Sequence, residues 1–190
     1  MVALSSRSYG ATILNIHNGP LMRAFPFFGN LMLIDFIPTL TVSHSQIAVF
    51  SRCLENPYND WQDQHVAQGF AWREHSVSFR TLNEFGPCLI EIGLSDHHPP
   101  SNDVIRSIRV PFTVQDDGQV EIASIGDSAP LSITPGPYSL LFQILGVSPE
   151  GTEKIRLTFA RKEPLDFAII QADEQIQADV PLCLTATVAC

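Results

Sequence analysis

The sequence predicts an all-β fold, mainly antiparallel, arranged as a β-sandwich with one short helix. Short segments in which apolar and polar residues alternate recur along most of the 190 residues. The chain also has 12 phenylalanines and few lysines, a composition that favours strands over helices. Strand patterns do not alternate with helical patterns, so a parallel sheet with crossover helices is not expected.

Residues 1–37 differ from the rest because they hold few charges and many apolar residues. We expect an N-terminal extension packed on the core, with candidate strands at residues 11–16 and 31–36. Residues 38–190 are expected to form the sandwich domain. The apolar stretch 21–40 is interrupted by charges, glycine and prolines, which argues against a membrane span. The N-terminus also lacks the pattern of a signal peptide.

The regular strand pattern begins at Thr39. Residues 40–50 are predicted to form one strand with a bulge near its middle. In residues 153–161, the apolar side chains of Ile155, Leu157 and Phe159 are expected to share one face. A weakly strand-like tail at residues 180–188 is expected to fray. The other predicted strands span residues 76–80, 89–94, 109–114, 120–125, 138–147 and 167–170.

An Asp117-Gly118 pair separates the predicted strands 109–114 and 120–125. This dipeptide is typical of a tight turn, so the two strands are predicted to form a hairpin. Pro111 lies inside the first of them and cannot donate a backbone hydrogen bond. We therefore expect an edge strand or a bulge at that position.

One helix is predicted at residues 61–68. Asn59 or Asp60 can cap its N-terminus, and Gly69 can end it. Asp60 and Asp63 are three residues apart and would share a face of the helix. Paired carboxylates can act as general acid and base, but acids near a helix N-terminus are more simply explained by the helix dipole.

The charge balance restricts the partners of the chain. Its 20 acidic and 11 basic residues give a formal net charge of −9. Such a protein is repelled by nucleic acids and by anionic membrane surfaces, and it suits a basic partner. General solubility would explain the acidity equally well.

Residue patterns typical of catalysis or cofactor binding are missing from the sequence. His97 and His98 adjoin Asp96, but adjacent side chains rarely converge on one metal ion, so a polar loop is favoured. Cys53 follows Arg52 without an identifiable histidine partner. The four cysteines lack zinc-site spacing and are expected to be free thiols in the cytoplasm. We therefore predict no catalytic residues, no metal and no cofactor.

Three blocks of the chain carry a resemblance to a known family. They are residues 43–50, residues 60–79 with Asp60-Trp61 and Gly69-Phe70, and residues 108–138 with Val110-Pro111-Phe112 and Gly136-Pro137-Tyr138. In order and spacing, residues 40–145 resemble the competence protein J family, which inhibits the nuclease through which DNA enters competent bacteria. The family-like core would span about residues 40–160, with additions before residue 38 and after residue 160.

The resemblance implies an inhibitor or immunity protein that binds a non-specific nuclease through its basic DNA-binding cleft. On this hypothesis Asp60, Trp61, Asp63, Asp116 and Asp117 form the contact surface, where carboxylates would take the place of DNA phosphates. Trp61 would be an aromatic anchor, although it could instead pack the helix onto the sheet. Asp116 and Asp117 could equally serve the turn itself. The resemblance does not imply direct nucleic-acid binding or membrane insertion.

Two alternatives belong to other classes of protein. A β-sandwich that binds carbohydrate would use Tyr58, Trp61 and Trp72, because sugars stack on aromatic rings. An enzyme would use His97 and His98 with a metal ion. Trp72 and Phe79, however, are expected in the core.

Overall fold

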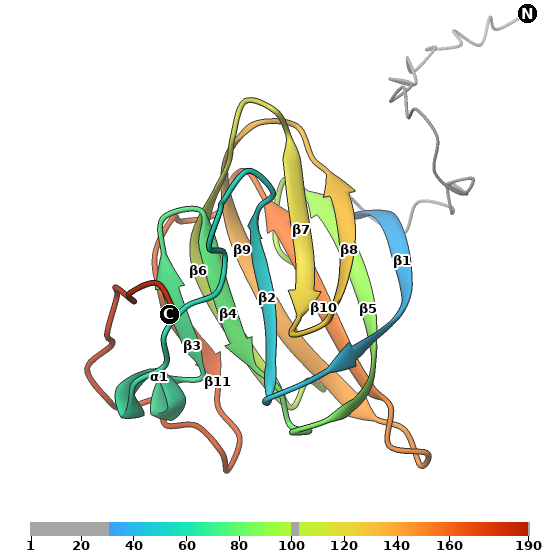
Figure 1. Cartoon of the computed structure of the whole chain (residues 1–190), viewed down its shortest axis with the longest axis vertical. Helices are drawn as coiled ribbons and strands as arrows, with labels where there is room; N and C mark the ends of the chain where they lie inside the picture. The colour runs from blue at the N-terminus through green and yellow to red at the C-terminus, as the bar shows by residue number, and fades with distance from the viewer. Residues whose placement is uncertain (1–30, 100–102, 190) are drawn as a thin grey trace, which may run out of the picture.

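The computed structural model describes residues 31–99 and 103–189, and it confirms the predicted β-sandwich (Figure 1). One layer is a six-stranded sheet with the strand order β1-β5-β10-β9-β6-β11. Its strands are β1 (Leu31–Val42), β5 (Gly86–Ser95), β10 (Glu153–Ala160), β9 (Gly136–Val147), β6 (Arg106–Val114) and β11 (Ala168–Gln171).

The second layer is a five-stranded sheet with the order β3-β4-β2-β7-β8. Its strands are β3 (Phe70–Arg73), β4 (Ser76–Arg80), β2 (Gln46–Ser51), β7 (Gln119–Ser124) and β8 (Asp127–Ser132). The single helix of the described chain, α1 (Asp63–Gln68), lies beside β3. Neighbouring strands are antiparallel, except for the parallel pair of β5 and β10.

The core between the two layers follows from the predicted alternation of apolar residues. Ile155, Leu157 and Phe159 of β10 all point into it and are completely buried. The rings of Phe79 in β4 and Phe142 in β9 stack with centroids 4.5 Å apart, which joins the two sheets at their centre. Phe79 is therefore a core residue, as predicted.

Side chains also close the two open sides of the sandwich. On one side, the backbone N–H of Thr41 in β1 donates to Asp127 Oδ2 at the start of β8, at 2.7 Å. On the other side, the ring of Phe167 packs on Trp72 and Phe70, with centroids 5.1 and 6.1 Å away. Trp72 also donates from Nε1 to the carbonyl of Pro111 at 2.8 Å, so it is packed against the core as predicted.

The prediction of one bulged strand at residues 40–50 is wrong. The chain leaves the six-stranded sheet at Val42 and enters the five-stranded sheet at Gln46. Between them, His44 and Ser45 have φ angles of 57° and 54°, which turn the backbone sharply. A local pattern of alternation cannot distinguish one bent strand from two strands in different sheets.

The predicted hairpin around Asp117-Gly118 is also wrong. The turn is present, because the N–H of Gly118 donates to the carbonyl of Gln115 at 2.9 Å. However, β6 pairs with β9 whereas β7 pairs with β2, so the turn carries the chain from one sheet to the other. β6 is not an edge strand, because it lies between β9 and β11. At Pro111, however, only the β9 side is paired, since β11 pairs only with residues 107–109, so the missing N–H of proline is tolerated.

β1 runs continuously across the predicted boundary between residues 37 and 38 and pairs with β5. The candidate strand at residues 11–16 lies outside the described residues, so the division into an extension and a sandwich stays a prediction. Among the described helices, none is long and apolar enough to cross a membrane. Three described cysteines, Cys53, Cys88 and Cys183, are free thiols, and of these Cys88 is buried.

Candidate protein-binding surface

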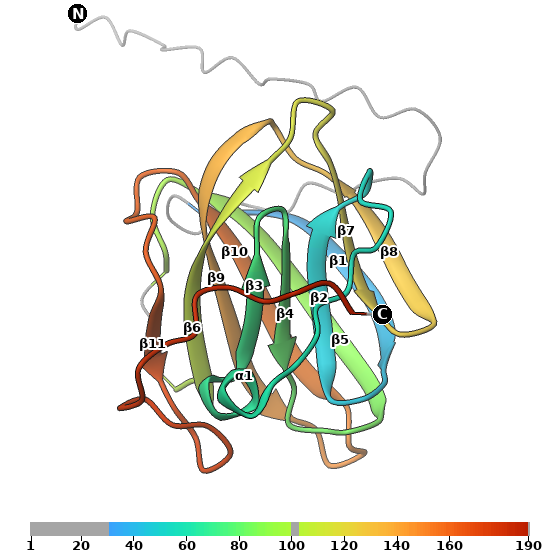
Figure 2. The ribbon, with the colours of Figure 1, turned by 60° about the vertical axis from the view of Figure 1, so that its left-hand side comes forward.

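Two chain segments lie over the outer face of the five-stranded sheet (Figure 2). The first is residues 53–68, which lead from β2 into α1, and the second is the C-terminal segment, residues 172–189. We call these two segments together the cover. The cover includes three of the predicted contact residues, Asp60, Trp61 and Asp63.

Apolar contacts hold the first segment of the cover on the sheet. Ala48, Phe50 and Ala123 face outward, and the side chains of Leu54 and Tyr58 pack on them. The rings of Phe50 and Tyr58 meet edge to face at 5.9 Å, and the Tyr58 hydroxyl donates to the carbonyl of Ser124 at 3.0 Å. The outer face of this sheet is thus a second, smaller core rather than a solvated surface.

Asn59 fixes the segment just before the predicted contact residues. It is buried, donates from Nδ2 to the carbonyl of Ala71 at 2.8 Å and accepts at Oδ1 from Arg73 Nε at 2.8 Å. Asn59 therefore does not cap the helix, and neither does Asp60. The N-cap is Gln62, whose backbone N–H donates to Nδ1 of His65 at 3.2 Å, while Gly69 ends the helix with a φ of 82°, as predicted.

The three contact candidates on the cover lie close together in sequence but differ in their environment. Asp60 is exposed, and its backbone N–H donates to the carbonyl of Thr187 at 2.8 Å. Asp63 is exposed at the first position of α1, where the helix dipole stabilises its negative carboxylate. Trp61 is half-buried and donates from Nε1 to Gln46 Oε1 at 3.1 Å, so it both packs on the sheet and leaves part of its ring accessible.

Asp116 and Asp117 lie at the opposite end of the sandwich. They are exposed in the turn between β6 and β7, next to the end of β2, where Cys53 Sγ donates to Gln115 Oε1 at 2.7 Å. Asp117 also accepts from the backbone N–H of Gln119 at 3.0 Å, which is the turn chemistry of the alternative interpretation. α1 lies beyond Arg80 at the far end of β4, so the length of a strand, about 15 Å, separates Asp63 from this turn. Asp60 lies nearer the middle of the sheet, because Asn59 just before it bonds to the carbonyl of Ala71.

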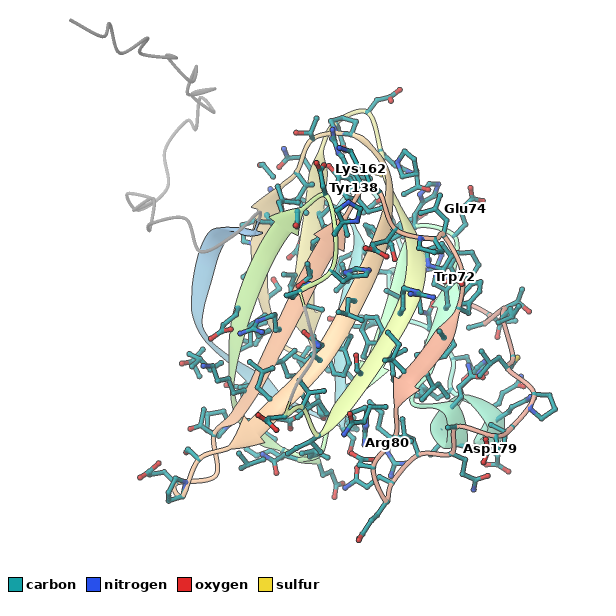
Figure 3. The ribbon with its side chains drawn as sticks, turned by 180° about the vertical axis from the view of Figure 1, so that it is seen from behind. Trp72, Glu74, Arg80, Tyr138, Lys162 and Asp179 are labelled. Carbon is teal, nitrogen blue, oxygen red and sulfur yellow. The ribbon has the colours of Figure 1, made fainter. Side chains whose placement is uncertain are left out.

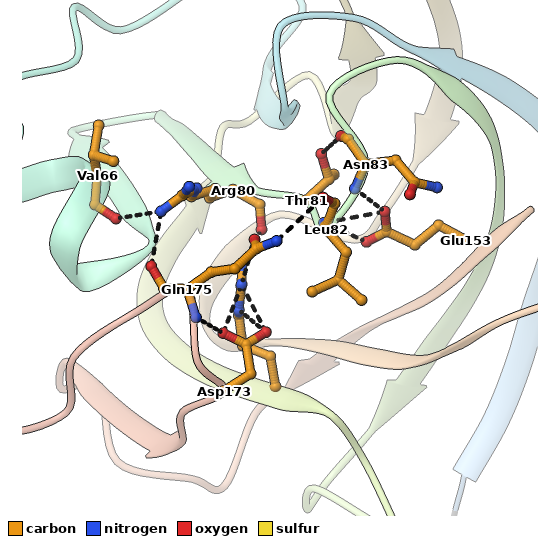
Figure 4. A network of polar contacts seen from close by, with 9 residues as sticks. Val66, Arg80, Thr81, Leu82, Asn83, Glu153, Asp173 and Gln175 are labelled. Atoms are coloured by element: carbon orange, nitrogen blue, oxygen red, sulfur yellow. Dashed lines mark hydrogen bonds and ion pairs between the residues drawn. The ribbon is translucent and has the colours of Figure 1, made fainter. Parts of the chain in front are cut away.

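The C-terminal segment lies against the sandwich, and the expectation that residues 180–188 fray stays a prediction. Arg106 of β6 is completely buried and makes a bidentate ion pair with Asp173, with Nη2 at 2.7 Å from Oδ2 (Figure 4). Further along, Val188 forms a β-bridge with Asn59. Sequence patterns missed this segment as part of the surface because its partners are far away in sequence, 67 positions for Arg106 and Asp173 and 120 positions for His65 and Thr185.

A second buried carboxylate lies close to the Arg106–Asp173 pair. Glu153 is completely buried and accepts backbone hydrogen bonds from Leu82 and Asn83, each at 3.1 Å (Figure 4). Burial raises the pKa of Glu153, while these two N–H groups and the charge of Arg106 oppose the shift. This network joins the start of the C-terminal segment to the ends of β4, β6 and β10.

The charge of the cover is one-sided. Its two segments contain six acids, and Lys and Arg are absent from both. Asp173 is paired with Arg106, whereas no described cation lies within ion-pair distance of the other five, Glu55, Asp60, Asp63, Glu174 and Asp179. The cover therefore presents carboxylates to solvent without counter-charges.

The histidines that could have bound a metal point to different partners. His97 Nδ1 lies 3.0 Å from Glu163 Oε1, whereas His98 Nε2 lies 2.9 Å from the hydroxyl of Ser139. The pKa of His98 is lowered to about 4, chiefly by burial; the charge of Glu163 opposes this shift, and those of Arg109 and His97 add to it. Within residues 31–99 and 103–189, no three His, Cys, Asp or Glu side chains are placed to hold a metal ion together.

Comparison with known families identifies the family of this chain. The family model of competence protein J matches residues 39–160, which is most of the chain. The chain belongs to the competence protein J family. The matched region contains both sheets from Thr39 through β10, so β11 and the C-terminal segment follow it.

Two solved structures resemble this competence protein J chain. One is ComJ from Bacillus subtilis, described as an inhibitor of the DNA-degrading activity of NucA. It has a TM-score of 0.60 and 20% sequence identity, and the match covers 68% of this chain and 97% of ComJ. The other is named Crocagin biosynthetic gene J, with a TM-score of 0.47 and 16% identity over 67% of this chain and 96% of that chain. No protein with a curated description matches the chain by sequence.

Proposed function

We propose that this protein binds a DNA-degrading nuclease and inhibits it, without catalysing a reaction itself. The observation that carries the proposal is membership of the competence protein J family over residues 39–160. The fold likeness to ComJ, an inhibitor of the DNA-degrading activity of NucA, adds support. The partner is then a protein with a basic cleft that normally holds DNA.

The charge of the cover offers a physical basis for this binding. A nuclease attracts DNA phosphates to a positively charged cleft, and the unpaired carboxylates of the cover can satisfy the same charges. Opposite fields also accelerate the encounter of the two proteins. Asp60, Asp63 and the accessible part of Trp61 are the proposed contacts, and Asp116 and Asp117 would contact a partner only if it spans both ends of the sandwich.

The carbohydrate alternative has less support from the geometry. Tyr58 packs against Phe50, and Trp72 packs against Phe167 with its Nε1 bonded to the core, so neither ring is free to stack on a sugar. The free thiols of the described cysteines favour action in a reducing compartment, and we propose the cytoplasm.

The test is inhibition of a nuclease encoded beside this protein. We expect a stoichiometric complex in size-exclusion chromatography and a loss of plasmid degradation when the two purified proteins are mixed. Bovine serum albumin at equal concentration is the control for non-specific protection of DNA. If the neighbouring genes encode no nuclease and none co-purifies with the tagged protein, the proposed function fails.

A further inference from the structure

The last part of the C-terminal segment, residues 177–189, is bound through its own backbone. Eight hydrogen bonds join it to residues 58–72, and each of them uses a backbone N–H or carbonyl of the bound segment. The N–H of Ala186, for example, donates to the carbonyl of Trp72 in the edge strand β3 at 2.7 Å. The other seven bonds go to residues 58–68, so the segment is held chiefly by the first segment of the cover, which includes α1, and it touches the sheet edge at one point.

Two polar side chains of α1, those of His65 and Gln68, form hydrogen bonds with the backbone of the bound segment. The amide of Gln68 is completely buried; its Oε1 accepts from the N–H of Cys183 at 2.8 Å, and its Nε2 donates to the carbonyl of Cys183 at 2.9 Å. His65 is also buried, with Nε2 3.3 Å from the carbonyl of Thr185. Because Nδ1 of His65 accepts from Gln62, Nε2 carries the proton and donates. With the segment in place these side chains are buried, and the backbone of the bound chain supplies hydrogen-bond partners for both of them.

The bound segment contributes little through its side chains. Leu184 and Val188 are 43% and 41% exposed, and the threonines at 185 and 187 are exposed as well. The residues just before it are held differently. Ile176 is buried, with its side chain against Gly69, and Asp173 is paired with Arg106. The chain is therefore fixed up to Ile176 by packing and an ion pair. Beyond it the chain is held mainly by backbone hydrogen bonds, and the partly buried side chain of Leu182 packs against the core.

The receiving residues all lie within the part of the chain matched by the family, whereas the bound segment lies after it. We propose that residues 58–72 form an acceptor site for an extended peptide segment that is recognised through its backbone, and that residues 177–189 occupy this site in cis. A partner's segment of the same chemistry can bind after displacing them. The inference does not depend on nuclease inhibition.

An exchange experiment on the full chain tests this site. A protease recognition sequence is inserted between Ala178 and Asp179, which are both exposed, and the protein is cut after folding. A fluorescent peptide of residues 180–189 is then added in reducing buffer, and its anisotropy is measured. We expect the peptide to bind the cut protein at one site per molecule and to leave the uncut protein unbound at the same concentrations.

Modified peptides distinguish backbone recognition from side-chain recognition. N-methylation at Cys183 and Ala186 removes two donors and is expected to weaken binding about tenfold or more. Thr185→Ser and Thr187→Ser, at exposed side chains, are expected to change binding less than about twofold. Equal binding of the N-methylated peptide, or no binding to a cut protein that retains its circular dichroism, overturns the proposal.

Hydrogen exchange on the uncut protein provides a measurement that needs no variant. A segment held mainly by backbone bonds opens locally, so the amides of Ala186 and Ala189 should exchange much faster than those of β10. If they exchange only as slowly as the β10 amides, the segment leaves only when the whole domain unfolds. That result would also overturn the proposal that a partner's segment can displace residues 177–189.

Discussion

The two outer faces of the sandwich carry their charges in different ways. On the six-stranded sheet, acids are matched with cations: Glu91 accepts from Lys154 and Arg156, and Asp166 pairs with Arg109. The cover of the five-stranded sheet instead holds five acids without a described counter-charge. Paired charges cancel at a distance, whereas unpaired ones project a field. The cover therefore contributes five unpaired acids to the net charge of −9.

The pairing on the six-stranded face also has a measurable electrostatic effect. The pKa of Glu91 is lowered because Lys154 and Arg156 bond to its carboxylate and outweigh the opposing effect of burial. Lys162 beside Asp96 acts similarly on the pKa of that carboxyl. Lys162 and Tyr138 lie near one end of this sheet, whereas Arg80 and Asp179 lie near the other (Figure 3).

The largest expected effect concerns the one cover acid that is paired. Asp173→Ala leaves the completely buried Arg106 without its counter-charge, and we expect a loss of about 3–5 kcal/mol in the free energy of unfolding. Urea denaturation followed by tryptophan fluorescence measures this loss. The matched control is Asp166→Ala on the other face, which breaks the exposed pair with Arg109 and should cost about 1 kcal/mol or less.

Similar losses for the two variants would show that burial of Arg106 does not distinguish these ion pairs. If Asp173→Ala does not fold, Asp173→Asn can be measured instead, because its amide keeps one acceptor oxygen near Arg106. It should still be less stable than Asp166→Ala, because the buried guanidinium keeps its charge and loses the carboxylate.

The contrast between the faces could be predicted from the sequence only in part. The alternation in residues 153–161 correctly gave β10 and its buried face, because that pattern depends on local geometry alone. The helix stop at Gly69 was also predictable, since a φ of 82° suits glycine. Sheet membership was not, because His44-Ser45 and Gln115–Gly118 are turns whose flanking strands choose partners far away in sequence.

The candidate site was predictable to the same extent. The acids Asp60 and Asp63 and the aromatic Trp61 stay predicted contacts, and the sequence suggested them because they lie in one short stretch. Their separation from Asp116 and Asp117 could not be found, because it depends on which ends of the strands coincide. The C-terminal segment was missed for a related reason: Gln68 and Cys183 bond to each other across 115 positions, and no local pattern marks that pair.

Charge reversals on the two faces are expected to have an effect of intermediate size, on the rate of association with the nuclease. Asp60→Lys on the cover is expected to slow association with the nuclease about tenfold at low salt, because it removes attraction toward a basic cleft. Asp166→Lys makes the same change in net charge on the six-stranded face and should slow association less. Stopped-flow or surface plasmon resonance at two ionic strengths measures both rates. Equal slowing by the two variants would mean that net charge, rather than the cover, steers the encounter.

The smallest expected effect lies at His98, which contacts Ser139 at the outer face of β9. Its pKa is about 4 in the folded protein against about 6.5 in the unfolded chain. Between these values the unfolded chain takes up a proton that the folded protein refuses, so the free energy of unfolding falls as the pH drops from about 6.5 to about 4. The ring is half-buried and solvent screens its charge, so we expect a loss of about 1 kcal/mol or less.

His98→Gln should remove this loss, and it is measured as the difference between wild type and variant in urea denaturation at pH 6.5 and 4.5. Ser139→Ala is the matched control, because it removes the hydrogen bond but keeps the histidine and therefore keeps the pH dependence. Protonation of Glu91 and Asp96 also lowers the free energy of unfolding as the pH falls toward and below the usual carboxyl range. This loss is the same in wild type and in His98→Gln, so it cancels in the difference. A pH dependence that His98→Gln leaves unchanged would assign the effect to these paired carboxylates instead.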